Sequence, residues 1–223
     1  SNKGKVDNWG YEVSTNWRKQ LTKDLTVDFR GTFTYTQNKY IDLDEPIYPY
    51  VWQTATGKPL NRRNGYIAEG LFQSQEEIDN SPTQNLGSKP MPGDIKYRDV
   101  DGNGMIDSKD QVMISKTAGM PRIQYGFGVN IDWKRFNFGV FFNGSAMRDI
   151  DINGLHPFGQ NDYNAMKFVA ENRWTEANPN PNAEYPRLGL NDSQMSNNSQ
   201  SSTYWIRNGN FLRFKTLEIG YRF

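Results

Sequence analysis

The residues best suited to chemistry lie in the twelve-residue stretch DVDGNGMIDSKD, residues 99–110. Its oxygen-bearing side chains follow the spacing of the EF-hand loop. That loop uses positions one, three, five, nine and twelve, a backbone carbonyl at seven and a sharp glycine turn at six. Glycine does fall at the sixth position here. The spacing therefore predicts a Ca²⁺ site. Its expected ligands are Asp99, Asp101, Asn103, Asp107 and Asp110, with the backbone carbonyl of Met105.

Position twelve departs from the EF-hand pattern because Asp110 replaces the usual bidentate glutamate. The shorter arm predicts weaker binding, with Kd roughly between 10⁻⁵ and 10⁻³ M. The preceding GDIKYR reads as extended rather than helical, so we expect an isolated loop. The alternative is an Asp/Asn/Gly turn that binds nothing. Repulsion among four carboxylates favours a cation, since only Arg98 and Lys109 lie near them in the sequence.

A second candidate site is aromatic. Tyr48, Tyr50 and Trp52 alternate in PIYPYVWQ and could stack on the rings of a sugar substrate. The alternative is that they pack against a neighbouring loop or a partner protein.

The elements that would carry these loops are strands. Apolar residues occupy every second position in residues 9–19, 25–36, 123–133 and 136–143, and again towards the end of the chain. This period of two predicts antiparallel strands with one apolar and one polar face. The connections within the first two pairs are short, whereas residues 38–121 and 147–210 form long loops that contain only short predicted helices. One is expected from Tyr163 to Arg173 with Asp162 as its cap, and another after Ser74.

Short turns alternating with long loops are typical of outer-membrane barrels. The predicted fold is therefore all-β: an incomplete portion of an antiparallel transmembrane β-barrel, with about five membrane strands and long extracellular loops. Trp9, Trp17 and Trp133 are expected at the ends of strands, in the membrane interface. The polar faces, with Asp28, Arg30, Asn130 and Asp132, would then line the lumen. The competing fold is a soluble extracellular β-sandwich that binds carbohydrate and holds a structural calcium.

Composition excludes several other classes. The 26 Lys and Arg residues balance 25 Asp and Glu, so no basic field favours nucleic acid. Without cysteine there is no disulfide, thiolate site or thiol nucleophile, and His156 has no second histidine to complete a zinc site. No apolar run reaches the roughly 18 residues of a membrane helix. The acid pairs Asp42 with Asp44 and Glu76 with Glu77 have nothing to fix them in one cleft, so we expect no enzyme.

Five segments together resemble the SusC/RagA family of TonB-dependent outer-membrane transporters. They occur in the family's order and span nearly the whole chain. The segments are GKVDNWGYEVSTNWRKQ near the start, GYIAEGLFQSQEEID at 65–79, PGDIKYRDVDGNGMIDSKDQ at 92–111, RWTEANPNPNAEYPRL at 173–188 and WIRNGNFLRFKTLEIGY at 205–221.

The resemblance implies that the chain is a C-terminal fragment of a barrel of about 22 strands, in the bacterial outer membrane and in contact with the lipid bilayer. More strands are then expected after Phe223. The resemblance also implies a SusD-like surface lipoprotein as a lid. TonB would act through an N-terminal part that this sequence lacks, and the substrate would be a glycan or a peptide.

Overall fold

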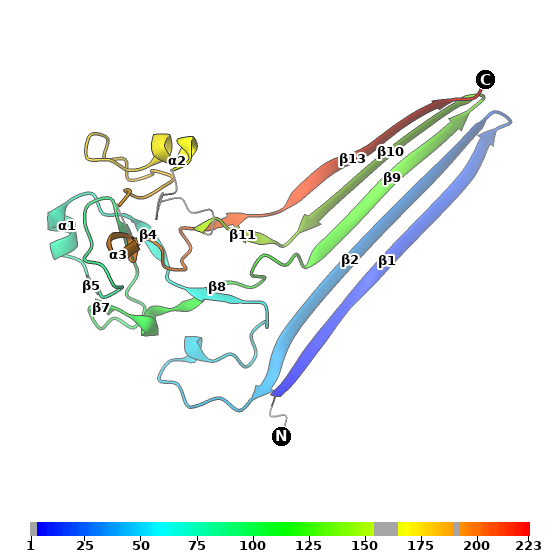
Figure 1. Cartoon of the computed structure of the whole chain (residues 1–223). Coiled ribbons are helices and arrows are strands. Elements are labelled where there is room, and N and C mark those ends of the chain that lie inside the picture. The colour runs from blue at the N-terminus through cyan, green and yellow to red at the C-terminus, as the bar shows by residue number, and fades with distance from the viewer. Residues whose placement is uncertain (1–3, 154–164, 190–191) are drawn as a thin grey trace.

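The computed structural model describes residues 4–153, 165–189 and 192–223, and its largest element is an antiparallel sheet of five long strands (Figure 1). Alternating side chains and β-branched or aromatic residues favour extended backbone in each of these segments. The strands are β1 (Gly4–Thr22), β2 (Leu25–Leu43), β9 (Ile123–Trp133), β10 (Phe136–Ala146) and β13 (Phe211–Tyr221).

The strand order in this sheet is β1-β2-β9-β10-β13. Each long strand therefore pairs with the next long strand along the chain. Two-residue turns at 23–24 and 134–135 close the hairpins, and Lys134 takes a positive φ of 54° in the second. The turns and the chain's end at Phe223 lie at one end of the sheet (Figure 1). The described residues of 44–122 and 147–210, which we call the loop module, lie at the other end.

The loop module holds the remaining, shorter elements. Its strands are β3 (Arg63–Gly65), β4 (Ala68–Leu71), β5 (Thr83–Gln84), β6 (Ile95–Tyr97), β7 (Met105–Ile106), β8 (Val112–Ser115), β11 (Asp149–Asp151) and β12 (Ile206–Asn208). Its helices are η1 (Val51–Gln53), α1 (Gln75–Asp79), η2 (Ser108–Asp110), α2 (Lys167–Asn172) and α3 (Asp192–Met195). Ser74 caps α1 as predicted, accepting a hydrogen bond from the Glu77 amide.

The register of the long sheet places apolar side chains on a single face across all five strands. Val13 of β1 pairs with Phe33 of β2, which pairs with Tyr125 of β9. Many of these side chains are exposed, and no second sheet covers them in the described part of the chain. They include Trp9, Tyr11, Val13, Trp17, Phe127, Trp133, Phe136, Phe138, Leu212, Phe214, Leu217, Ile219 and Tyr221.

A β-bulge between β10 and β13 preserves this one-sided pattern. Phe141 pairs with Thr216 and the next residue, Phe142, pairs with Phe214, so Lys215 is skipped. The sequence of β13 changes parity at this point, and the extra residue keeps Phe214 and Leu217 on one face.

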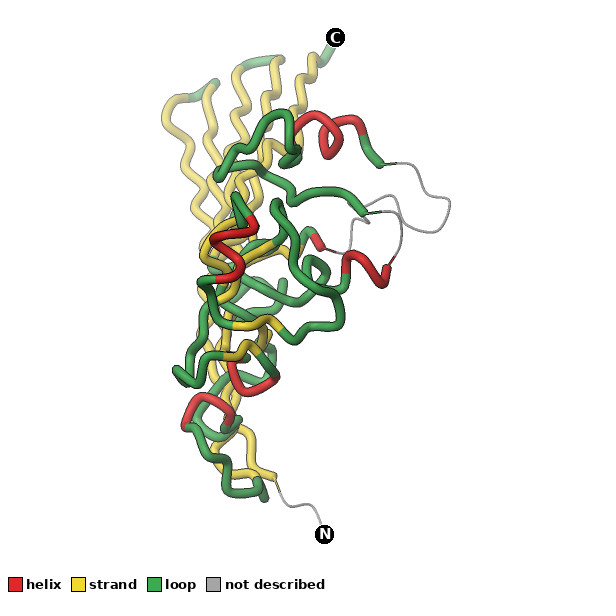
Figure 2. The backbone as a smooth tube through the Cα atoms, turned by 90° about the vertical axis from the view of Figure 1, so that its left-hand side faces the viewer, coloured by secondary structure: helices red, strands yellow, loops and turns green. Residues whose placement is uncertain are grey.

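The hydrophobic core lies in the loop module and not in the sheet. Segments from both long connections contribute to it (Figure 2 shows the module folded beside the loop end of the strands). Trp205 is fully buried at its centre, and its indole donates a hydrogen bond of 2.8 Å to the carbonyl of Asn198. The core members are Tyr66, Leu71, Leu86, Ile95, Tyr97, Ile106, Val169, Trp174, Ala183, Tyr185, Met195 and Trp205.

A buried polar network joins the two connections beside this core. The Gln84 amide donates to Asn197 at 2.7 Å, and Asn198 donates to Asp94 at 2.7 Å. Arg187 pairs with the fully buried Asp94 at 2.6 Å. Burial raises the pKa of Asp94, and the Arg187 guanidinium acts against that effect. Each buried group is thus held by a partner from the other long connection.

Three expectations from the sequence need revision. Trp9 and Trp17 do not lie at the ends of their strand, because β1 runs from Gly4 to Thr22 and both lie inside it, whereas Trp133 is the last residue of β9. The long connections are more than loops with short helices, since they share a hydrophobic core. The expected helix begins later, at Lys167, with Met166 at its N-cap; Asp162, Tyr163 and His156 lie outside the described residues.

None of the helices that the structure describes combines the length and the apolar character needed to span a bilayer.

Candidate functional site

The loop at residues 99–110 brings three of the predicted calcium ligands together. Carboxylate oxygens of Asp99, Asp101 and Asp110 all lie within 4.8 Å of one another. Positive φ angles at Gly102 (74°) and Gly104 (83°) let the chain fold back around them. The short strand β7 follows Gly104 directly. The local geometry thus gathers negative charge in a small space.

Backbone amides hold these carboxylates in place. Asp99 accepts hydrogen bonds from the amides of Gly102 and Gly104, both at 2.7 Å. Partial desolvation alone would raise the pKa of Asp99. The amides, Gly104 foremost, outweigh it and leave that pKa below its ordinary value. Asp99 is therefore ionised at neutral pH.

Asp110 ties the two ends of the loop together. It is fully buried, and its oxygens accept from the amides of Val100 (2.7 Å) and Asp107 (2.8 Å). Asp107 itself turns away from the cluster, because its side chain accepts from the Lys109 amide at the start of η2. The Asn103 side-chain oxygen accepts from the amide of Met105. Asp110 thus supports the loop's shape as well as its charge.

Nearby cations do not neutralise the cluster. Arg98 pairs with Glu69 at 2.8 Å, and the Lys109 ammonium lies 3.9 Å from Asp107. Among the described residues, no lysine or arginine forms an ion pair with Asp99, Asp101 or Asp110. The donor set consists of hard oxygens, which is the chemistry that Ca²⁺ prefers.

The structure places two of the three aromatic candidates, Tyr50 and Trp52, against this same loop, whereas Tyr48 is exposed. The Tyr50 and Trp52 rings stack with centroids 4.5 Å apart. Trp52 Nε1 donates to the Lys109 carbonyl at 2.8 Å, and Tyr50 hydrogen-bonds the Asp101 carboxylate. This hydrogen bond raises the pKa of Tyr50. Sequence reasoning treated the two sites separately, because their adjacency depends on the folding of residues 44–58.

The predicted polar-face residues lie together on the sheet. A hollow of about 490 Å³ on that side is lined by residues from all five strands, including Arg30, Thr32 and Thr216, so the polar face is concave. The Arg30 guanidinium sits 4.7 Å from the centroid of the Phe141 ring. Asp132 accepts from Asn137 at 2.9 Å.

The acid pairs have ordinary surroundings. Glu77 pairs with Lys96 at 3.1 Å and accepts from the Gln73 amide, while Glu76 lies in the first turn of α1. Asp42 lies in β2 opposite Lys5, and Asp44 follows that strand. These positions give the acids structural surroundings rather than a shared cleft.

Known proteins resemble the chain over nearly its whole length. It is 27% identical to the TonB-dependent receptor P26 of Formosa agariphila, covering 99% of the chain and 22% of that receptor. It is also 27% identical to the TonB-dependent receptor SusC of Bacteroides thetaiotaomicron, covering 100% of the chain and 21% of SusC. No protein-family model matches the chain.

A solved structure shares the fold. The RagAB peptide transporter superposes on 99% of the chain and 23% of its own, with a TM-score of 0.66 and 20% identity. The chain thus spans about a fifth of the length of the curated relatives it matches. Those relatives are named as receptors and not as enzymes.

Proposed function

We propose that this chain, a homologue of the SusC-type TonB-dependent receptors, forms part of the wall and the outer loops of a barrel that imports nutrients across the bacterial outer membrane. The observation that carries the proposal is the one-sided sheet. Its apolar face is exposed across five strands while its polar face is concave. A bilayer satisfies the first face and a water-filled lumen the second.

Strand length supports the same orientation. A tilted strand crosses a bilayer with roughly 9–11 residues. The three shorter strands have 11 residues each, whereas β1 and β2 have 19. The five strands would thus all cross the membrane, and β1 and β2 would extend beyond it. The loop module would then stand on the extracellular side.

The competing sandwich has less support. A sandwich core would place the stripes of Val13, Phe127 and Leu217 against a second sheet, yet all three are exposed. The core that does exist lies in the loop module.

The cargo and partners follow from the relatives. We expect oligosaccharides or peptides as cargo, a SusD-like lipoprotein over the loop module, and TonB acting through other parts of the receptor. Transport of this kind needs binding and gating but no bond chemistry.

Deletion of the gene for the complete receptor tests this function. Uptake of labelled oligosaccharides and peptides is compared with uptake in the parent strain and in a strain without TonB. We expect both deletions to remove the same uptake, and the receptor to co-purify with a surface lipoprotein. Uptake that persists without TonB would contradict the proposal.

The loop at 99–110 has a role within this function. We propose that Ca²⁺ binds between Asp99, Asp101 and Asp110 and stiffens the loop module. The gathered carboxylates without a paired cation support this, as does the oxygen donor set. Tyr50 and Trp52 then act as supports of the loop, and a direct contact of Tyr48, Tyr50 or Trp52 with sugar is the less favoured role.

A further inference from the structure

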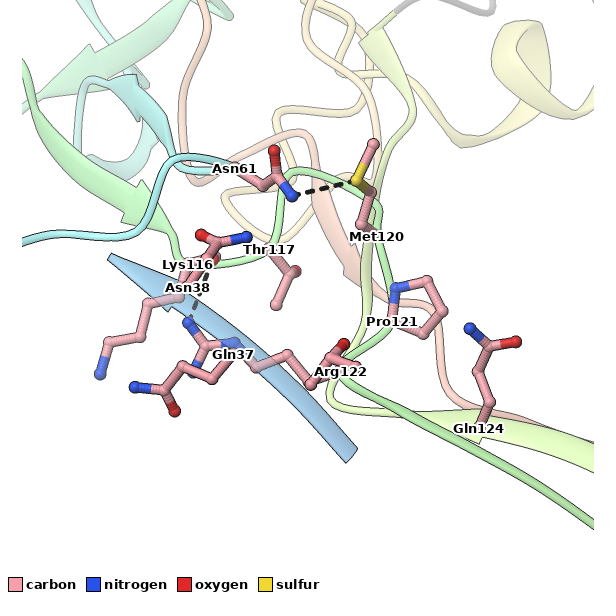
Figure 3. A pocket seen from close by; sticks show the side chains of 10 residues that line it. Gln37, Asn38, Asn61, Lys116, Thr117, Met120, Pro121, Arg122 and Gln124 are labelled. Carbon is pink, nitrogen blue, oxygen red and sulfur yellow. Dashed lines mark hydrogen bonds between the residues drawn. The ribbon is translucent and has the colours of Figure 1, made fainter. Parts of the chain in front are cut away.

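A polar pocket of about 280 Å³ lies where the strands meet the loop module (Figure 3). Its walls come from the loop end of β2, the start of β9, the segment after η1 and the connection 116–122. We call it the mouth pocket. Two cations, Lys116 and Arg122, and the amide side chains of Gln37, Asn61 and Gln124 line it. None of these residues stands out in the sequence, because they are scattered over four segments.

Positive charge continues beyond the mouth pocket. An adjoining hollow of about 470 Å³ shares Lys116, Thr117 and Arg122 with it and adds Arg148 and Arg207. Asp149 is the carboxylate in this lining, and it accepts hydrogen bonds from the hydroxyl of Ser115 and the amide of Gly119. In the described ranges, none of the four cations forms an ion pair. The two linings thus carry four cations against one carboxylate, an excess of positive charge in a chain of net charge +1.

A buried hydroxyl between the two hollows also lacks a partner. Thr117 is 8% exposed, and its Oγ1 has no hydrogen-bond partner. Its backbone is fixed, since its amide donates to Ser115 and its carbonyl accepts from Met120. Leaving a buried hydroxyl unpaired costs free energy, so such a group in a pocket wall suits a ligand that pairs with it.

The cations keep donors available. Arg122 uses one terminal nitrogen for the Lys116 carbonyl at 3.3 Å, as the dashed line in Figure 3 marks. Arg148 uses Nε for the Gly119 carbonyl at 2.9 Å. The remaining guanidinium N–H groups suit a carboxylate or sulfate, because they present parallel donors.

We propose that the mouth pocket and its adjoining hollow bind an acidic oligosaccharide, with a uronate carboxylate or a sulfate on Lys116 and Arg122. This deepens the proposed import function and rests on it. The amides favour a sugar over an acidic peptide, since each offers both a donor and an acceptor to ring hydroxyls. Thr117 would bond one such hydroxyl.

The experiment measures binding to the complete receptor in detergent by calorimetry. The probes are tetragalacturonate, a sulfated tetrasaccharide, neutral maltotetraose and tetraglutamate, each at low and high salt. We expect the acidic saccharides to bind more tightly than maltotetraose and tetraglutamate. High salt should weaken the binding of the acidic saccharides. The two acidic saccharides distinguish a carboxylate site from a sulfate site.

Variants localise the site. K116Q/R122Q removes two charge-assisted contacts and should weaken the binding of acidic saccharides about tenfold or more. T117V should weaken the binding of acidic saccharides by a smaller factor, because it removes a hydroxyl without changing the charge of the pocket. The matched control K23Q/R135Q removes two charges at the turns, at the other end of the sheet, and should change nothing. If K116Q/R122Q fails to assemble, R122K keeps the charge but loses the guanidinium fork, and it should still weaken binding.

The inference is overturned if no acidic saccharide binds, if K116Q/R122Q or R122K binds it as the parent does, or if tetraglutamate binds as tightly. The import function is judged separately by TonB-dependent uptake. Uptake of neutral sugar without acidic binding would leave the function standing and remove this inference.

Discussion

The indole of Trp52 donates a 2.8 Å hydrogen bond to the carbonyl of Lys109, 57 positions along the sequence. This contact joins an aromatic segment to the acidic loop and assigns Trp52 a structural role. W52F removes the donor and leaves a smaller aromatic ring. We expect a loss of about 1 kcal/mol in local stability, or roughly fivefold faster amide exchange in residues 99–110. Hydrogen exchange measured by mass spectrometry checks it, with Y48F as the control. Equal exchange in the two variants would argue against the anchoring role.

Calcium should stabilise the loop module. With a Kd of about 10⁻⁴ M, calcium at a hundred times that concentration adds about 2.7 kcal/mol to the free energy of unfolding. Thermal unfolding of the complete receptor is compared in calcium and in excess chelator. D99N/D101N should remove the difference, and N64D, which adds an acid in strand β3 outside the loop, serves as the control. A chelator-insensitive parent protein would exclude the site.

Val13 tests which face of the sheet meets lipid. V13R places a charge at the middle of the exposed apolar stripe and should cost about 2–4 kcal/mol if that face lies in the bilayer. S14R, one residue away on the polar face, should be tolerated. Assembly in the outer membrane, measured by protease protection, separates the two. Equal assembly would contradict the proposed orientation.

Gly93 is required by both its backbone and its neighbour. Its φ is +88°, and an added Cβ would lie 2.3 Å from the Trp174 ring. Gly57 is a matched control, since its φ is +82° and nothing lies within 4 Å. We expect G57A to cost about 1–2 kcal/mol from backbone strain, and G93A to cost about 1–3 kcal/mol more from overpacking. Limited proteolysis in urea measures both, and similar costs would show that Trp174 moves aside.

Glu45 makes one turn of the loop module sensitive to acid. Hydrogen bonds from the Thr56 hydroxyl and from the amides of Ala55 and Thr56 lower the pKa of Glu45 below 4.5. A lowered folded-state pKa stabilises the fold above the unfolded value, and that contribution disappears as pH falls through the folded value. Below about pH 4.5 we expect residues 54–58 to open more readily. Amide exchange compared with E45Q at each pH tests this, and the two should converge in acid.

The strands were predictable because their side chains alternate, and β9 and β10 begin and end close to the expected residues. The full length of β2 was not, because Asn38, Lys39 and Asp42 are polar on both faces and carry no period-two signal. The spacing of residues 99–110 predicted their turn, since that geometry is local. The mouth pocket and the contact between Trp52 and Lys109 depend on long-range packing, which no local pattern encodes.

The core of the loop module was not predictable from the sequence for a similar reason. Trp174 and Trp205 lie in segments that read as polar loops, and their burial depends on residues from the other connection. The predicted helix near Met166 is shorter than expected. It has six residues, and only Val169 among them is buried. A single apolar anchor gives little periodic signal.

The hydrogen bond from Gln84 to Asn197 spans 113 positions, which sets an order of events during biogenesis. The hairpin of β1 and β2 needs only neighbouring residues, so it can form as soon as that stretch of polypeptide is available. The network around Asp94 stays incomplete until the segment near Trp205 arrives. Such distant pairings form slowly, and the loop module would therefore mature after the β1–β2 hairpin.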